Sequence, residues 1–370
     1  MKSKWRLLVP WVVCALIAGC GPATDWETTT TPTAIVEATR APASTTRPPD
    51  TATLPPEVTR PAPTPLPGST DVPWWGGRIA TVDAEPESIG KPTGLAAGPD
   101  GSLYLADART HRILHLDGEG RILHAWGTQG QSSEGAVAPT GTFNEPWGLA
   151  VGPDGSVYVA DTWNHRIQKF DGTGRFLLAW GEPCIGCSGP YELFGPRDVA
   201  VSKSGLVLVS DTGNKRIVVY DQAGQYIGQA GGAGTGPGQF EEPVGLALDA
   251  SDHLFVADQR NRRVQVFALA PDGSLTWQAD WPVDGWKTNT PEYKPFLCFC
   301  LGHIFLTDPE TGSVQEYSPA GEKLRTYDIN SLGTLNPGIT YGITCDPAGA
   351  LWVSDSIGGL GVLVRVVPRP

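Results

Sequence analysis

Short apolar segments alternate with glycine-containing turns along most of the chain and repeat about every fifty residues. Four copies open on Pro92, Pro146, Pro196 and Pro243, and each continues through four apolar runs separated by polar turns. Runs of this length between glycine turns are typical of β-strands. Four such strands per repeat are typical of a propeller blade, so the pattern predicts an all-β fold.

One aspartate recurs after the second predicted strand of every copy and gives the number of blades. Successive aspartates are 54, 50, 47, 50 and 47 residues apart, and the last two copies are weaker than the first four. The spacing predicts a six-bladed β-propeller of four-stranded antiparallel blades. The six positions are Asp107, Asp161, Asp211, Asp258, Asp308 and Asp355.

The two ends of the repeat region complement each other. The last copy supplies three strands, and an additional apolar segment, 78–83, precedes the first copy. Pairing this N-terminal strand into the last blade would close the ring and remove an exposed sheet edge.

The N-terminus has the pattern of an export signal. Lys2, Lys4 and Arg6 precede an apolar run, 7–19, which is too short for a membrane span. The run ends Ile-Ala-Gly-Cys20, which resembles a bacterial lipobox and predicts a lipid on Cys20 as membrane anchor. The alternative is an ordinary signal peptide in which Cys20 has no role. Either way the expected location is extracytoplasmic.

The segment after the signal has the composition of a disordered spacer. Residues 21–70 contain 14 Thr and 11 Pro and few residues able to form a core. We therefore expect a signal peptide at 1–19, a disordered stalk at 20–74 and the propeller at 75–370. The net charge of −12 repels phosphate backbones and argues against nucleic-acid binding.

The triplets between the second and third strands resemble the Asn-His-Leu triplet of the NHL repeat. They read Thr110-His111-Arg112, Asn164-His165-Arg166, Asn214-Lys215-Arg216 and Asn261-Arg262-Arg263. The resemblance extends over residues 76–368 and implies a six-bladed propeller. It further implies either a recognition platform for protein or RNA or, in a minority of members, a lyase or hydrolase with a metal in the channel.

An acidic and a basic residue recur five positions apart in the first four blades. We expect ion pairs that shape the turn between strands two and three, with bidentate guanidinium contacts. Repetition at one position favours a structural role over a catalytic one. The pairs are Asp107/Arg112, Asp161/Arg166, Asp211/Arg216 and Asp258/Arg263. Three phenylalanines ahead of the opening prolines, Phe143, Phe194 and Phe240, are expected to pack between blades.

One face of the propeller is expected to carry the long connections between blades, and such loops commonly carry recognition. At the mouth of the channel on this face we expect an aromatic and basic surface. Its candidate residues are Trp147, Arg197, Phe296 and Tyr341 beside the opening prolines, and Arg109, Trp163 and Arg260 in the turns. Asp198, the one charged oxygen ligand at the innermost strand starts, is a further candidate of this face. The alternative is that Trp147 and Phe296 pack between blades and that the basic residues form a solvated rim.

The cysteines predict disulfides, since exported thiols tend to oxidise. Cys184 and Cys187 lie in one loop and favour a small disulfide, with a redox motif or half a zinc site as alternatives. Cys300 and Cys345 occupy equivalent inner positions of neighbouring blades and could form a bridge, with Cys298 as competitor.

Together these patterns predict a non-catalytic recognition scaffold without metal or cofactor, which binds a protein, peptide or glycan through the loop-rich face. The alternatives are a metal-dependent hydrolase or lyase of propeller type and a structural part of an envelope assembly.

Overall fold

The computed structural model describes residues 77–80, 89–133, 136–183, 189–286, 293–329, 339–357 and 360–366, all within one compact unit, Pro67–Pro370. The predicted signal peptide, Cys20 and the stalk lie outside these residues. No helix among them is long and apolar enough to cross a membrane.

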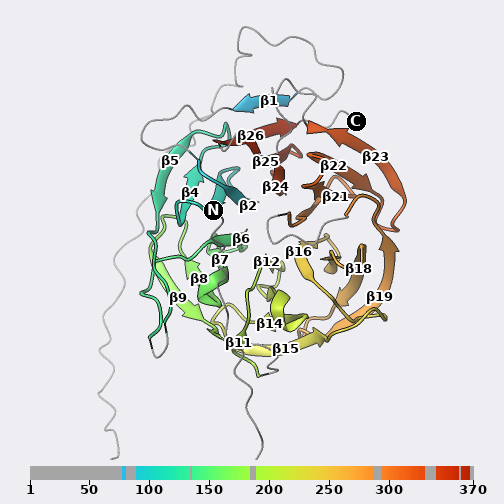
Figure 1. Cartoon of the computed structure of the whole chain (residues 1–370), viewed down its shortest axis with the longest axis horizontal. Coiled ribbons are helices and arrows are strands. Elements are labelled where there is room, and N and C mark those ends of the chain that lie inside the picture. The colour runs from blue at the N-terminus through green and yellow to red at the C-terminus, as the bar shows by residue number, and fades with distance from the viewer. Residues whose placement is uncertain are drawn as a thin grey trace, which may run out of the picture. The chain divides into compact units, whose positions relative to one another are not determined.

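Six four-stranded antiparallel sheets form a ring, which confirms the predicted propeller (Figure 1). Blades one to three are β2(Pro92–Ala97), β3(Leu103–Asp107), β4(Arg112–Leu116), β5(Ile122–Trp126); β6(Pro146–Val151), β7(Val157–Asp161), β8(Arg166–Phe170), β9(Phe176–Trp180); and β12(Asp198–Val201), β13(Val207–Asp211), β14(Arg216–Tyr220), β15(Tyr226–Gly231). Blades four and five are β16(Pro243–Leu248), β17(His253–Asp258), β18(Arg263–Leu269), β19(Leu275–Pro282); and β20(Leu297–Cys300), β21(His303–Asp308), β22(Ser313–Tyr317), β23(Lys323–Asp328). Blade six contains β24(Ile339–Cys345), β25(Leu351–Ile357) and β26(Leu360–Val366).

The N-terminal strand closes the ring, as predicted. β1(Gly77–Ala80) pairs antiparallel with β26, with Gly77 opposite Val366 and Ala80 opposite Leu363. Figure 1 shows β1 at the rim beside β26, where every other blade has its fourth strand. The remainder of the expected strand, 81–83, lies outside the described residues.

The first strand of each blade lies nearest the axis, and glycine there allows neighbouring blades to approach closely. A Cβ on Gly94 would lie 2.2 Å from the carbonyl oxygen of Trp147 in the next blade. Gly148, Gly245 and Gly342 occupy the same position, each with neighbouring-blade atoms within 3.0 Å of a Cβ. Blade three has Asp198 at this position.

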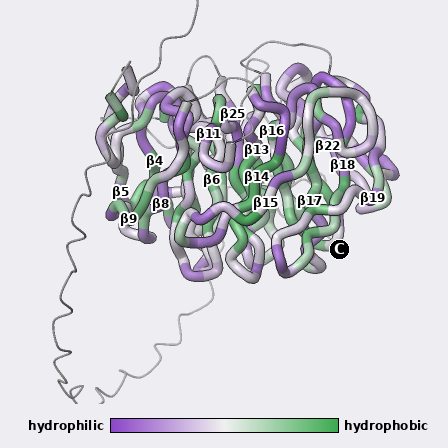
Figure 2. Tube along the Cα trace, turned by 90° about the horizontal axis from the view of Figure 1, so that it is seen from below, coloured by the Kyte–Doolittle hydropathy of each residue, from purple (hydrophilic) through white to green (hydrophobic). Residues whose placement is uncertain are grey.

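The core lies between adjacent blades, and Figure 2 shows hydrophobic strands with hydrophilic turns at their ends. Phe143 and Phe240 are fully buried there, as expected. Phe194 also packs between blades, since it stacks on His165 of blade two at 5.0 Å, but it is only partly buried. The fully buried residue of this loop is its neighbour Leu193, which shares with Phe143 and Phe240 the spacing of three residues before the opening proline.

Two further elements lie where one blade meets the next. β10(Glu182–Pro183) and β11(Glu192–Leu193) pair in parallel within the loop between blades two and three. Cys300 of β20 and Cys345 of β24 form a disulfide with their Cα atoms 5.5 Å apart, which confirms the inter-blade bridge. Cys298 is a buried free thiol, and Cys184 and Cys187 lie outside the described residues.

Candidate functional site

The Asp–Arg pairs hold the long loops against their blades. The Nε–Oδ2 distance is 2.8 Å in Asp161/Arg166, 2.8 Å in Asp211/Arg216 and 3.1 Å in Asp258/Arg263. Asp107/Arg112 is looser, at 3.8 Å. The expected bidentate contact with the carboxylate is wrong for the three close pairs. Their Nη groups donate mainly to loop carbonyls instead, because the loop between blades folds over the guanidinium.

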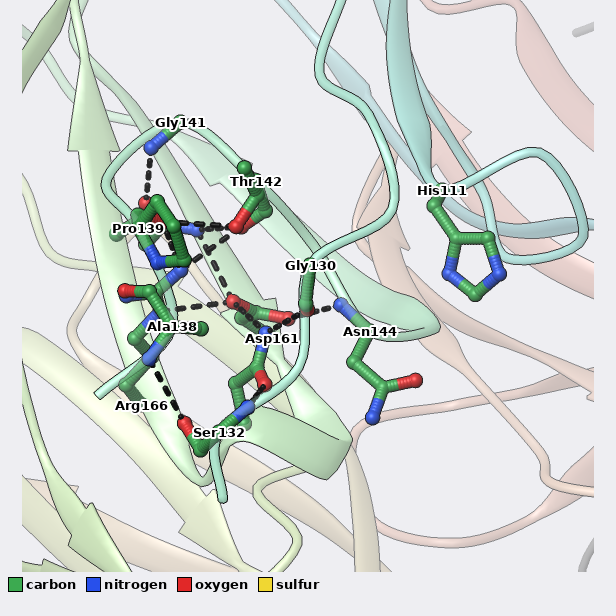
Figure 3. Close-up of polar contacts among 12 residues, drawn as sticks. His111, Gly130, Ser132, Ala138, Pro139, Gly141, Thr142, Asn144, Asp161 and Arg166 are labelled. Atoms are coloured by element: carbon green, nitrogen blue, oxygen red, sulfur yellow. Dashed lines mark hydrogen bonds and ion pairs between the residues drawn. The ribbon is translucent and has the colours of Figure 1, made fainter. Parts of the chain in front are cut away.

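Blade two shows the arrangement in detail (Figure 3). Arg166 donates to the carbonyls of Ala138, Pro139 and Thr142 at 2.6, 2.9 and 2.8 Å. Asp161 accepts from the amide of Asn144 at 2.7 Å. Together these bonds hold residues 138–144 against the blade, just before the start of β6, so the pair has a structural role.

The histidines of the triplets connect neighbouring blades. His111 Nδ1 accepts from the amide of Glu145, and His165 Nδ1 accepts from the amide of Gly195, each at 3.0 Å. This bond requires an unprotonated Nδ1. Burial lowers the pKa of His165, which favours that state.

A cavity of about 210 Å³ lies inside the ring, lined by the inner strands. Asp198 is the charged residue in its lining. Its carboxylate accepts from the amide of Val199 at 2.9 Å and from the amide of Leu246 in the next blade at 2.8 Å. Leu246 lies opposite Val256 of β17, just after a register shift that begins at Pro243. Asp198 therefore belongs to the channel wall and joins two blades, which corrects its expected place on the ligand face.

The buried carboxyl of Asp198 predicts a pH-dependent stability. Burial raises its pKa from 3.8 to about 8, so the folded protein binds this proton more tightly than the unfolded chain. Its contribution to stability is complete below about pH 4 and is lost as the pH rises through about 8.

We therefore expect the free energy of unfolding to fall with rising pH over this interval, more steeply than in Asp198→Asn. The difference in slope should reach about 1.4 kcal/mol per pH unit. Urea denaturation at a series of pH values would measure both slopes, and parallel curves would contradict the assignment.

The aromatic residues at the channel mouth are buried, which favours the alternative that Trp147 and Phe296 pack between blades. Trp147, Phe296 and Tyr341 are nearly inaccessible to solvent. Trp147 from blade two and Phe296 from blade five belong to one hydrophobic cluster with Ile343 of blade six. Because these rings meet across blades, they form the floor of the mouth.

Arg197 lies on this floor. Its Cζ is 4.1 Å from the ring centroid of Trp147 and 5.2 Å from that of Trp163. The residue is 6% exposed, and its guanidinium makes no hydrogen bond with any residue that the structure describes. Burial lowers the pKa of Arg197 to about 10, so the group remains charged at neutral pH. Trp163 is 38% exposed and gives the mouth an accessible aromatic wall.

Further charged residues surround the mouth, and the sequence interpretation missed three of them. Lys294 is 1% exposed and contacts Glu242 at 2.7 Å, and Arg260 contacts the same carboxylate at 3.4 Å. Lys91 lies 5.1 Å from the ring of Trp147 and 5.8 Å from that of Tyr341. Lys91, Glu242 and Lys294 each precede an opening proline, a repeat position that would have identified them. Arg109 is exposed in the turn of blade one.

No group of three or more His, Cys, Asp or Glu side chains within the described ranges has the geometry to hold a metal ion. The site is thus an aromatic and charged mouth above an apolar channel.

Sequence comparison assigns the repeats. The NHL repeat model matches residues 90–116, 143–170, 195–220 and 240–267, which contain the four Asp–Arg pairs. Four of the six blades of this propeller therefore contain sequences that match the NHL repeat.

Relatives share parts of this region. Rat peptidylglycine alpha-amidating monooxygenase is 38% identical over 182 residues, which are 48% of this chain and 13% of that protein. Human NHL repeat-containing protein 2 is 38% identical over 69 residues, 19% of this chain and 9% of that protein. This chain therefore covers only a small part of these relatives.

Two solved structures share the fold. A gluconolactonase from Xanthomonas campestris superposes with a TM-score of 0.55 at 17% identity, covering 83% of this chain and 99% of that one. A streptogramin B lyase superposes with a TM-score of 0.52 at 13% identity, covering 80% of this chain and 100% of that one. At these identities the likeness concerns the fold alone.

Proposed function

We propose that this protein is a non-catalytic recognition scaffold that binds a protein, peptide or glycan through the loop-rich face of the propeller. The observation that carries the proposal is the guanidinium of Arg197, held between Trp147 and Trp163 without a hydrogen-bond partner among the described residues. A buried donor without a partner is costly, and a ligand oxygen would satisfy it. Tryptophan and arginine are also the residues that dominate binding energy at interfaces.

The charges around the mouth indicate the chemistry of the ligand. Arg197, Lys91, Lys294 and Arg260 outnumber the nearby carboxylates of Glu145 and Glu242. The chain as a whole carries a net charge of −12, so this basic mouth is a local exception. We propose that the ligand presents a carboxylate to Arg197, because a guanidinium binds planar carboxylates in a charge-assisted contact.

The proposed location is the outer side of a membrane, with a lipid on Cys20 as anchor and residues 20–74 as spacer. The apolar run before Cys20 and the Thr- and Pro-rich composition support this. The name of the rat relative refers to a peptide substrate, which agrees with a peptide as ligand here.

Peptide and glycan arrays probed with the purified protein and two variants would test the proposal. Arg197→Ala should weaken binding to carboxylate-bearing ligands by about 2 kcal/mol, roughly thirtyfold. Arg175→Ala removes the same charge from the exposed turn between β8 and β9 and should leave binding unchanged. Undiminished binding by a folded Arg197→Ala protein would rule out the mouth as the site. Turnover of a bound ligand would favour the hydrolase or lyase alternative.

A further inference from the structure

Blade five lacks the arginine that blades two to four place beside their buried aspartate. Arg166, Arg216 and Arg263 each lie five residues after that aspartate, and the equivalent residue in blade five is Ser313. Asp308 remains in its place and is buried like its counterparts. No ion pair joins Asp308 to any lysine, arginine or histidine in the described part of the chain.

The other contacts of the arginine site are retained in blade five. Gln315 Nε2 donates to Asp308 Oδ2 at 3.2 Å and to the carbonyl of Asp284 at 3.0 Å. In blade two the corresponding amide, Gln168 Nε2, donates to Asp161 Oδ2 at 3.0 Å and to the carbonyl of Thr142 at 2.8 Å. Asp284 therefore presents the carbonyl that corresponds to Thr142.

These corresponding carbonyls bind guanidinium in the other blades. Arg166 Nη2 donates to the carbonyl of Thr142 at 2.8 Å, and in blade four Arg263 Nη2 donates to that of Gln239 at 2.8 Å. The glutamine of blade four, Gln265, donates to the same Gln239 carbonyl at 2.7 Å. Blade five thus retains both the carboxylate and the carbonyl that hold an arginine elsewhere.

A cavity of about 510 Å³ lies at this place in blade five, lined among others by Asp284, Asp308, Ser313 and Asp328. Gly285 keeps it open, since a Cβ there would lie 2.5 Å from Asp308 Oδ2. Three carboxylates and one lysine, Lys323, line the cavity, so its charge is negative. It is lined by residues 284 and 285 ahead of blade five, by the turn between β21 and β22, and by β22 and β23. The turn between β21 and β22 places it on the loop-rich face.

We propose that this cavity binds an arginine side chain of the partner. The guanidinium would take the position of Arg166, Arg216 and Arg263 and donate to the Asp308 carboxylate and the Asp284 carbonyl. A guanidinium fits better than an ammonium group, because its fixed fork of donors matches acceptors that already bind such a fork in three blades. The burial that raises the pKa of Asp308 also strengthens its attraction for a cation. The inference rests on the recognition role proposed for the loop-rich face but uses residues separate from Arg197.

Calorimetric titration of the purified protein with Nα-acetyl-arginine methylamide would test the site. We expect saturable binding at one site, and binding of the corresponding lysine compound about tenfold weaker. Ser313→Arg fills the cavity from within and should weaken binding by about tenfold or more while raising the melting temperature. Ala320→Arg adds the same charge at an exposed turn between β22 and β23, on the opposite face, and should bind like the unchanged protein.

Asp308→Asn provides a second variant in case Ser313→Arg does not fold, and it should weaken binding by about tenfold. Equal binding by either folded variant would overturn the proposal, as would the absence of saturable binding to the unchanged protein. Displacement of the arginine compound by stoichiometric calcium would also overturn it in favour of a metal site. Arg197→Ala should leave this titration unchanged, so a failure at the channel mouth is distinguishable from a failure here.

Discussion

We expect Arg166→Ala to lower the free energy of unfolding by about 3–5 kcal/mol, because the substitution leaves the carboxylate of Asp161 buried without its cation. Arg166 is 3% exposed, and its guanidinium also donates to three loop carbonyls, contacts that the variant would lack. Urea denaturation monitored by tryptophan fluorescence would measure the change.

Arg175→Ala is the matched control for this prediction. Arg175 pairs with Asp171 at 2.9 Å, nearly the same distance as in the Arg166 pair, but its side chain is 76% exposed. Exposed pairs contribute little, so the change should stay below about 1 kcal/mol. Similar losses for the two variants would contradict the view that burial and the loop carbonyls determine the importance of the Asp–Arg pair.

Removing the disulfide between Cys300 and Cys345 should lower the free energy of unfolding by about 4 kcal/mol. The bond spans 45 residues, and a closed loop of this length restricts the unfolded chain by about that amount in the chain-entropy model. The double variant Cys300→Ala/Cys345→Ala avoids placing a hydroxyl in the apolar surroundings of Cys300.

The control for the disulfide is Cys298→Ala, which removes a buried thiol without opening a covalent loop. It should cost about 1 kcal/mol. Peptide mapping after alkylation under non-reducing conditions would identify the bonded pair directly. A bond from Cys298 to either partner, or a double variant as stable as Cys298→Ala, would contradict the assignment.

The ring and its closure could be predicted from the sequence because their signals are local. The Asp markers, the glycine turns and the segment before the first copy each depend on a few neighbouring residues, and β1 pairs with β26 as the strand count required. Whether Trp147 is exposed at the mouth or packed between blades could not be decided in this way. Its burial depends on contacts with residues of other blades, Phe296 and Ile343, that are distant in the sequence.

The sequence shows that Asp198 departs from the repeat, but its role could be recognised only in the structure. It stands where four other blades have glycine, so the departure from the repeat can be read directly. Its role depends on the amide of Leu246 in the next blade. The two residues are 48 positions apart, so nothing in the sequence around residue 198 identifies this contact. Similarly, the sequence shows that Ser313 departs from the repeat. The cavity beside it could not be predicted, because it depends on where residues 284 and 285 lie in the structure.

The pairing of β1 with β26 has a consequence for the order in which the protein folds. Gly77 and Val366 are about 290 residues apart in the chain. Contacts at such separation form slowly, because the intervening chain loses conformational freedom before the contact provides any gain. β1 must therefore wait until β26 is available, while blades one to five can each assemble from continuous segments. The blade that closes the ring is therefore the last to form, and a chain lacking β26 would retain five blades but not a closed ring.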